Sequence, residues 1–173
     1  MGEQPGGGVR PVGGSPGGGS PAVTRTCTVD RDRIARFVRA LGGTPHPAHT
    51  DPAAARALGH PDVIAPPTYL AVLAAPAEDQ LLADWPGFTS EGAVHRAQSV
   101  RLARPVHAGE TLRATARVAD HTDRAGRPQL TLECAFHTPG GTWVATTTSS
   151  LLGPVATAGP DRRPLDPTGS EQP

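Results

Sequence analysis

Apolar residues first recur with a helical period just after Asp30. They occupy positions i, i+3, i+4 and i+7 of this segment, and a glycine follows them: Ile34, Phe37, Val38, Leu41 and Gly42. The spacing predicts an amphipathic helix that lies on a larger body, with Asp30 as its N-cap and the glycine as its end.

Prolines divide residues 43–58 into two parts. The first, residues 43–50, contains two prolines and is predicted to be a loop without regular helix. Asp51 followed by Pro52 then predicts the N-cap and first residue of a short helix that runs through Leu58.

A further helix opens at the Ala-Pro-Pro run of residues 65–67. Its first turns have almost no polar face, because the residues are Tyr69, Leu70, Val72, Leu73 and Ala74. A helix that is apolar on every side is normally buried, so we expect this helix at the centre of the fold.

After about residue 92 the apolar period changes to two. Two runs alternate in this way, and their apolar members are Leu112, Ala114, Ala116 and Val118, then Leu130, Leu132, Cys134 and Phe136. Residues 143–152 are rich in threonine and β-branched side chains, and residues 123–126 and 139–141 supply turns. Helices followed by antiparallel strands predict an α+β fold, with a curved sheet wrapped round the buried helix.

Composition limits the class of protein and the extent of the domain. The chain has 173 residues, 16 basic and 16 acidic residues and only 3% aromatic residues, which argues against nucleic-acid binding. No apolar run reaches the length of a membrane span, so we expect a cytoplasmic protein. Residues 1–22 and 156–173 are predicted to be disordered tails around one domain at residues 23–155.

Residues 42–68 resemble the active-site segment of the MaoC-like hot-dog hydratases and dehydratases. The family pattern is G-D-x-N-P-x-H followed by I-A-P-P-T-F, and the chain reads G-T-P-H-P-A-H and later I-A-P-P-T-Y. Residue by residue, Thr44 stands for the catalytic aspartate, His46 for the asparagine and His49 for the catalytic histidine. The chain keeps the position of the base and lacks the acid.

The resemblance extends over most of residues 28–153. Residues 34–40 match the leading helix of the family, residues 104–110 match its R-P-x-x-A-G-D turn, and residues 94–98, V-H-R-A-Q, resemble its V-H-G-[DE]-Q element. The likeness is closest to the N-terminal MaoC-type dehydratase domain of HadA-like actinobacterial subunits of (3R)-hydroxyacyl-ACP dehydratases. It implies a single hot-dog fold and an acyl-ACP or acyl-CoA thioester substrate, in fatty-acid or polyketide metabolism.

In that family the histidine removes a proton from C2, the aspartate handles the hydroxyl, and backbone N–H groups at the start of the central helix hold the enolate oxygen. His49 matches the base, but Thr44 has no carboxyl group and Pro67 has no N–H. The resemblance therefore implies a half-site that a second MaoC-like hot-dog subunit completes, in a heterodimer or a homodimer. The substrate-binding residues it implies are Ala65, Pro66, Pro67, Thr68, Tyr69 and His95.

Other interpretations stay open. A thioesterase commonly carries an acidic residue on or near the central helix, whereas the first acids after Pro67 are Glu78 and Asp79, too far along it. A non-enzymatic acyl-binding scaffold is a further alternative, and the sequence leaves open whether the chain is an enzyme on its own. A metal site made of His46 and His49 with Asp51 and His60 is another alternative, but the prolines and the loop disfavour a preorganised ligand set. We expect no metal and no cofactor.

Overall fold

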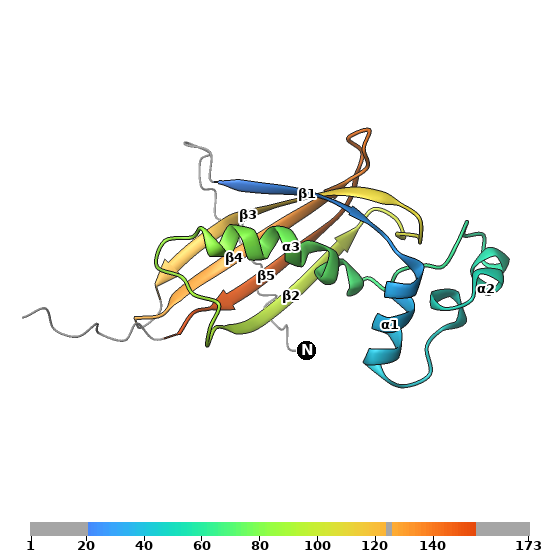
Figure 1. Cartoon of the computed structure of the whole chain (residues 1–173), viewed down its shortest axis with the longest axis horizontal. Coiled ribbons are helices and arrows are strands. Elements are labelled where there is room, and N and C mark those ends of the chain that lie inside the picture. Colours follow the sequence, from blue (N-terminus) through green and yellow to red (C-terminus); the bar gives the residue numbers. More distant parts are fainter. Residues whose placement is uncertain (1–20, 124–125, 155–173) are drawn as a thin grey trace, which may run out of the picture.

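One antiparallel sheet of five strands curves round a long helix, α3 (Figure 1). The computed structural model describes residues 21–123 and 126–154. The elements in chain order are β1 (Ala22–Thr28), α1 (Arg31–Leu41), the 3₁₀ helix η1 (Pro47–His49), α2 (Pro52–Ala57), α3 (Tyr69–Ala83), β2 (Val94–Leu102), β3 (Thr111–Asp123), β4 (Pro128–His137) and β5 (Trp143–Leu152).

The core lies between α3 and the inner face of the sheet. The strands follow the order β1-β3-β4-β5-β2, so β1 and β2 are the two edges. The alternating residues predicted to face inward on β3 and β4 are buried, and so are seven residues of α3. The sequence analysis therefore placed the central helix and the faces of these two strands correctly.

The helices α1, η1 and α2 gather at the end of the molecule where α3 begins (Figure 1). Both predicted N-caps are present: Asp30 Oδ1 accepts a hydrogen bond from Arg33 N–H at 2.7 Å, and Asp51 Oδ1 accepts one from Ala53 N–H at 2.8 Å. The prediction of a plain loop at residues 43–50 was wrong in one respect, because η1 forms there.

The histidine that stands in place of the motif asparagine explains how η1 begins. His46 Nδ1 accepts a hydrogen bond from the N–H of Ala48 at 3.2 Å, and Pro47 occupies the first helical position, where no N–H is required. His46 thus caps η1 with a ring nitrogen where an asparagine side-chain oxygen would serve.

The sequence analysis missed both edge strands. β1 lacks a regular alternation of apolar residues, and β2 has no fully buried residue, so it lacks the alternating burial pattern that marks β3. Edge strands carry a weaker periodic signal because they cover less of the core. Among the described residues, no helix is long and apolar enough to cross a membrane.

The boundary of the predicted N-terminal tail can be tested by truncation. Pro21 and Ala22 are among the described residues, whereas residues 1–20 and 155–173 are not. Deleting residues 1–20 is expected to leave the thermal melting temperature unchanged, because this Gly/Pro-rich segment offers little apolar area to bury. Deleting residues 1–28 removes β1 and is expected to lower the melting temperature; calorimetry of the two truncations beside the full chain checks both results, and a clear loss in the shorter truncation contradicts the tail prediction.

Candidate functional site

A cavity of about 340 Å³ lies beside the start of α3, and we call it the His49 cavity. Its walls come from η1, from the segment before α3 and from the end of β2 with the turn that follows: His49, Ile64, Ala65, Pro67, Leu102, Ala103, Arg104 and Pro105. Backbone pairing between the two segments fixes this geometry, since Ala65 N–H donates to Val106 O at 2.8 Å and Ile64 bridges to His107.

The ring of His49 is held in one orientation by the backbone. Its Nδ1 lies 2.7 Å from the carbonyl oxygen of Ile64. A carbonyl oxygen only accepts hydrogen bonds, so Nδ1 carries the proton and Nε2 of the neutral ring keeps its lone pair. This arrangement gives His49 the tautomer that a general base at the cavity requires.

The acid that the family motif supplies is missing from this cavity. Thr44 is exposed in the loop after α1 and does not line the cavity with His49. Pro67 does line it, but its ring nitrogen carries no hydrogen to donate. The eight residues that form the walls include no carboxylate. The cavity therefore contains an oriented histidine ring, no carboxylate among its walls and no N–H from Pro67.

Arg104 is a cavity residue that the sequence analysis assigned only to a tight turn. It donates to both carboxylate oxygens of Glu110, at 2.9 and 2.7 Å. Glu110 Oε1 also accepts from the backbone N–H of His107 at 2.8 Å, and the His107 ring lies 3.0 Å from the same oxygen and 3.2 Å from His60. Partial burial raises the pKa of the Glu110 carboxyl, but the hydrogen bonds from Arg104 and His107 outweigh it and leave this pKa below its usual value.

This network predicts a pH dependence of stability. Folding lowers the pKa of Glu110, so this carboxylate contributes to the free energy of unfolding. The contribution is fully present above the unfolded pKa of about 4.3 and is lost as the pH falls through the folded pKa. Glu110→Gln is expected to cost about 1 kcal/mol or less at neutral pH, since the pair is partly exposed. Denaturant unfolding of the wild type and of Glu110→Gln between about pH 7 and pH 3 checks this. The difference between their free energies of unfolding should shrink on acidification, and a difference that grows would contradict the assignment.

The structure brings only some of the predicted substrate-binding residues together. Ala65 and Pro67 line the cavity together with the predicted catalytic His49, whereas Pro66 is buried and does not line it, and Thr68 is the exposed N-cap of α3. Tyr69 is buried, its ring packs edge-on against Phe37 with centroids 5.4 Å apart, and its hydroxyl has no hydrogen-bond partner. His95 lies at the opposite end of β2 from this cavity.

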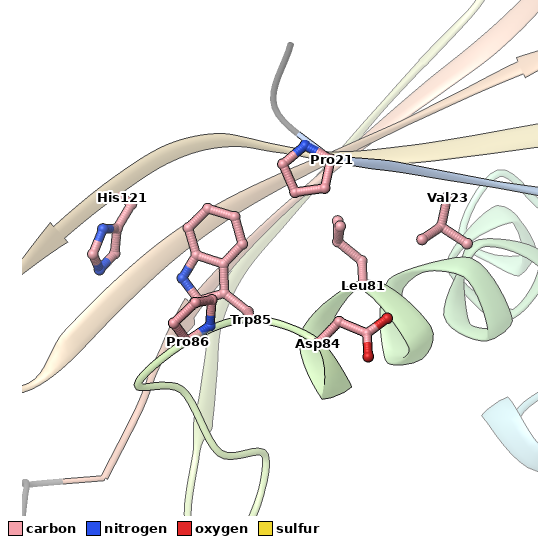
Figure 2. Close-up of a pocket in the computed structure, with 7 residues that line it drawn as sticks. All are labelled: Pro21, Val23, Leu81, Asp84, Trp85, Pro86 and His121. Atoms are coloured by element: carbon pink, nitrogen blue, oxygen red, sulfur yellow. The ribbon is translucent and has the colours of Figure 1, made fainter. Parts of the chain in front are cut away.

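Two further cavities flank the second half of α3. One, of about 470 Å³, lies towards β1 and β3 and has mostly apolar walls, with Trp85 packed edge-on against His121 and Asp84 at its rim (Figure 2). The other, of about 260 Å³, lies towards β5 and β2 and contains Glu78 and His95. Glu78 is thus remote from the His49 cavity, in agreement with the sequence argument against a thioesterase site.

The weak alternative of a metal site gains no support from the histidine geometry. His46 Nδ1 is occupied by the amide of Ala48, and His49 Nδ1 by the carbonyl of Ile64. The two rings lie 6.1 Å apart, centre to centre. Within residues 21–123 and 126–154, no three His, Cys, Asp or Glu side chains are grouped so that they could hold a metal ion.

The antiparallel sheet wrapped round the buried helix α3 defines a hot-dog protein. The family described as FAS1-like, dehydratase domain region matches residues 19–138. The chain therefore belongs to this family of MaoC-like hot-dog proteins.

Known proteins agree with this assignment. A UPF0336 protein of Clavibacter michiganensis is 42% identical over 125 residues, which are 72% of this chain and 83% of the relative. Among solved structures, the C-terminally truncated HadBC (3R-hydroxyacyl-ACP dehydratase) complex from Mycobacterium tuberculosis superposes with a TM-score of 0.69 at 24% identity, covering 78% of this chain and 96% of that one. The (R)-hydratase from A. caviae involved in PHA biosynthesis superposes with a TM-score of 0.61 at 24% identity, again covering 78% of this chain and 96% of that one. At this identity the structures support the fold alone.

Proposed function

We propose that the chain is one subunit of a (3R)-3-hydroxyacyl-thioester dehydratase or enoyl hydratase, and that a second hot-dog subunit supplies the catalytic aspartate and histidine. The observation that carries this proposal is the His49 cavity, which has an oriented base and no carboxylate among its wall residues. The family match supports the reaction type, since the family over residues 19–138 is described as a dehydratase domain region.

Dehydration requires the loss of a C2 proton and the protonation of the departing hydroxyl, which leaves as water. A histidine accepts the first proton well near neutral pH, whereas a threonine hydroxyl has no accessible acidic form to deliver the second. Thr44 therefore fails in the role that the family gives to aspartate. The chain's contribution is then to bind and orient the acyl thioester, with the chemistry carried by the partner.

β2 provides the surface through which a second subunit would join. It is a sheet edge, and its residues from Val94 to Ser99 are all exposed. An exposed edge of this length offers unpaired backbone groups to another strand, and pairing with the β2 of a second hot dog removes the edge from both chains. The HadBC relative is itself described as a complex.

This interface predicts an oligomer in solution. Light scattering at micromolar concentration is expected to give a dimer, either of the chain alone or of the chain with its hot-dog partner. A monomer under both conditions would contradict the proposal, because the half-site would then have nothing to complete it.

Reconstitution tests the function itself. The partner to use is a MaoC-like chain with an intact G-D-x-N-P-x-H segment, sought first in the gene beside this one. The two chains should co-elute, and the mixture should hydrate trans-2-enoyl thioesters of CoA or of an acyl carrier protein at a rate well above the sum of the separate chains. Co-elution without added activity favours the non-catalytic scaffold instead.

A further inference from the structure

The larger of the two cavities beside the second half of α3 combines apolar walls with an indole ring, and we call it the Trp85 cavity. Its volume of about 470 Å³ lies in the range of sites for small organic molecules. Leu81 contributes a buried apolar surface and Trp85 a half-buried ring, while Pro21, Val23 and Pro86 complete the apolar part (Figure 2). The cavity can therefore hold the hydrocarbon part of a ligand.

The indole of Trp85 is held in place but not covered. The ring of His121 packs edge-on against it, with centroids 5.8 Å apart and an angle of 72° between the ring planes. The indole remains partly exposed at the cavity. The face of an indole carries negative electrostatic potential and attracts a cation more strongly than the other aromatic side chains do. The wall thus favours a positively charged ligand group.

The charge at the rim of the cavity points to the same kind of ligand. Asp84 is exposed, it is the single carboxylate among the seven residues that line the cavity, and none of the seven is lysine or arginine. Within the part of the chain that the structure describes, no ion pair involves Asp84. A cationic group at the rim would gain attraction from this carboxylate, whereas an anionic group would be repelled.

The Trp85 cavity is separate from the candidate active site. It lies at the end of α3 rather than at its start, and it shares no lining residue with the His49 cavity. It adjoins β1 and β3, at the opposite side of the sheet from the β2 edge. A second subunit that joins through β2 would therefore leave the cavity open.

We propose that the Trp85 cavity binds a small organic cation, in which an apolar body carries a protonated or quaternary amine. The apolar body lies against Leu81 and Val23, and the charged nitrogen lies at the rim, against the indole of Trp85 and near the carboxylate of Asp84. This activity goes beyond the proposed dehydratase function and does not depend on it. Fatty acids and other anionic amphiphiles are disfavoured by the charge of Asp84.

The test is an NMR titration of the full chain that follows its indole N–H signals. The chain has two tryptophans, and Trp143 serves as the internal control. Its ring does not line the cavity, its indole N–H donates to Thr146 Oγ1 at 2.9 Å, and the Arg101 guanidinium lies 5.3 Å from its centre. The probes are octyltrimethylammonium, octanol and octanoate, each below the concentration at which it aggregates.

The ammonium probe is expected to move the Trp85 signal and leave the Trp143 signal in place. It should bind about 5- to 20-fold more tightly than octanol, because it adds a cation–π contact and an attraction to a carboxylate. Octanoate should bind more weakly than octanol. An unmoved Trp85 signal, equal shifts of both tryptophan signals, or binding of octanoate as tight as that of the ammonium probe overturns the proposal.

Variants assign the preference to the two residues that provide it. Asp84→Asn is expected to weaken binding of the ammonium probe about 2- to 5-fold and to leave octanol binding unchanged. Asp79→Asn is the matched control, since it removes an exposed carboxyl of α3 that lines the other cavity, and it should change neither affinity. Trp85→Leu, measured by calorimetry, should reduce the advantage of the ammonium probe over octanol. If Trp85→Leu does not fold, as judged by circular dichroism, Asp84→Asn decides, and an ammonium affinity unchanged in Asp84→Asn overturns the proposal.

Discussion

Replacing His49 by alanine is expected to slow the reconstituted complex less than about 10-fold, whereas the same change at the motif histidine of the partner subunit should slow it by about 100- to 10,000-fold. The reason is that His49 has an oriented ring but no carboxyl beside it, so the principal base and acid belong to the other chain. Steady-state hydration of a trans-2-enoyl thioester by the two variant complexes measures the asymmetry.

His46→Ala provides a matched control for that comparison. It changes a histidine of the same segment that caps η1 and does not line the cavity, so it reports any loss caused by loosening the loop. If His49→Ala lowers the rate of the complex by about 100-fold or more and His46→Ala does not, this chain uses its own base and the half-site account is wrong.

Truncating Phe136 to alanine is expected to destabilise the protein by about 3–5 kcal/mol. Its side chain is fully buried on the inner face of β4, in the core that surrounds α3, so the change removes apolar contacts and leaves a cavity. Urea unfolding measures the loss. Thr131→Ala, on the outer face of the same strand, serves as the control and should change the free energy of unfolding by about 0.5 kcal/mol or less; a similar loss in both variants would show that the register of β4 is wrong.

The sequence predicts the centre of this fold well because the centre is where burial imposes a pattern. The apolar helix at Tyr69 is enclosed in the core, and β3 and β4 each bury one face against it while the other face stays outside, so their periods are clear. The edge strands were not predicted from the sequence, for the opposite reason. β1 and β2 each have one free side and few buried residues, so their sequences carry little periodic signal.

The candidate site could be predicted only where it is local in sequence. His49, Ala65 and Pro67 lie in one motif and share one cavity, as expected. Arg104 joins them through pairing between segments far apart in the chain, which no local pattern reports.

The central claim, that this chain alone lacks a complete site, is tested most directly by one assay. Hydration of trans-2-enoyl-CoA by the purified chain is measured over a range of protein concentrations, with His49→Ala purified in parallel. The account predicts a rate indistinguishable from buffer for both proteins. A rate that rises in proportion to wild-type protein and disappears in His49→Ala would contradict it, because the chain would then possess an acid of its own.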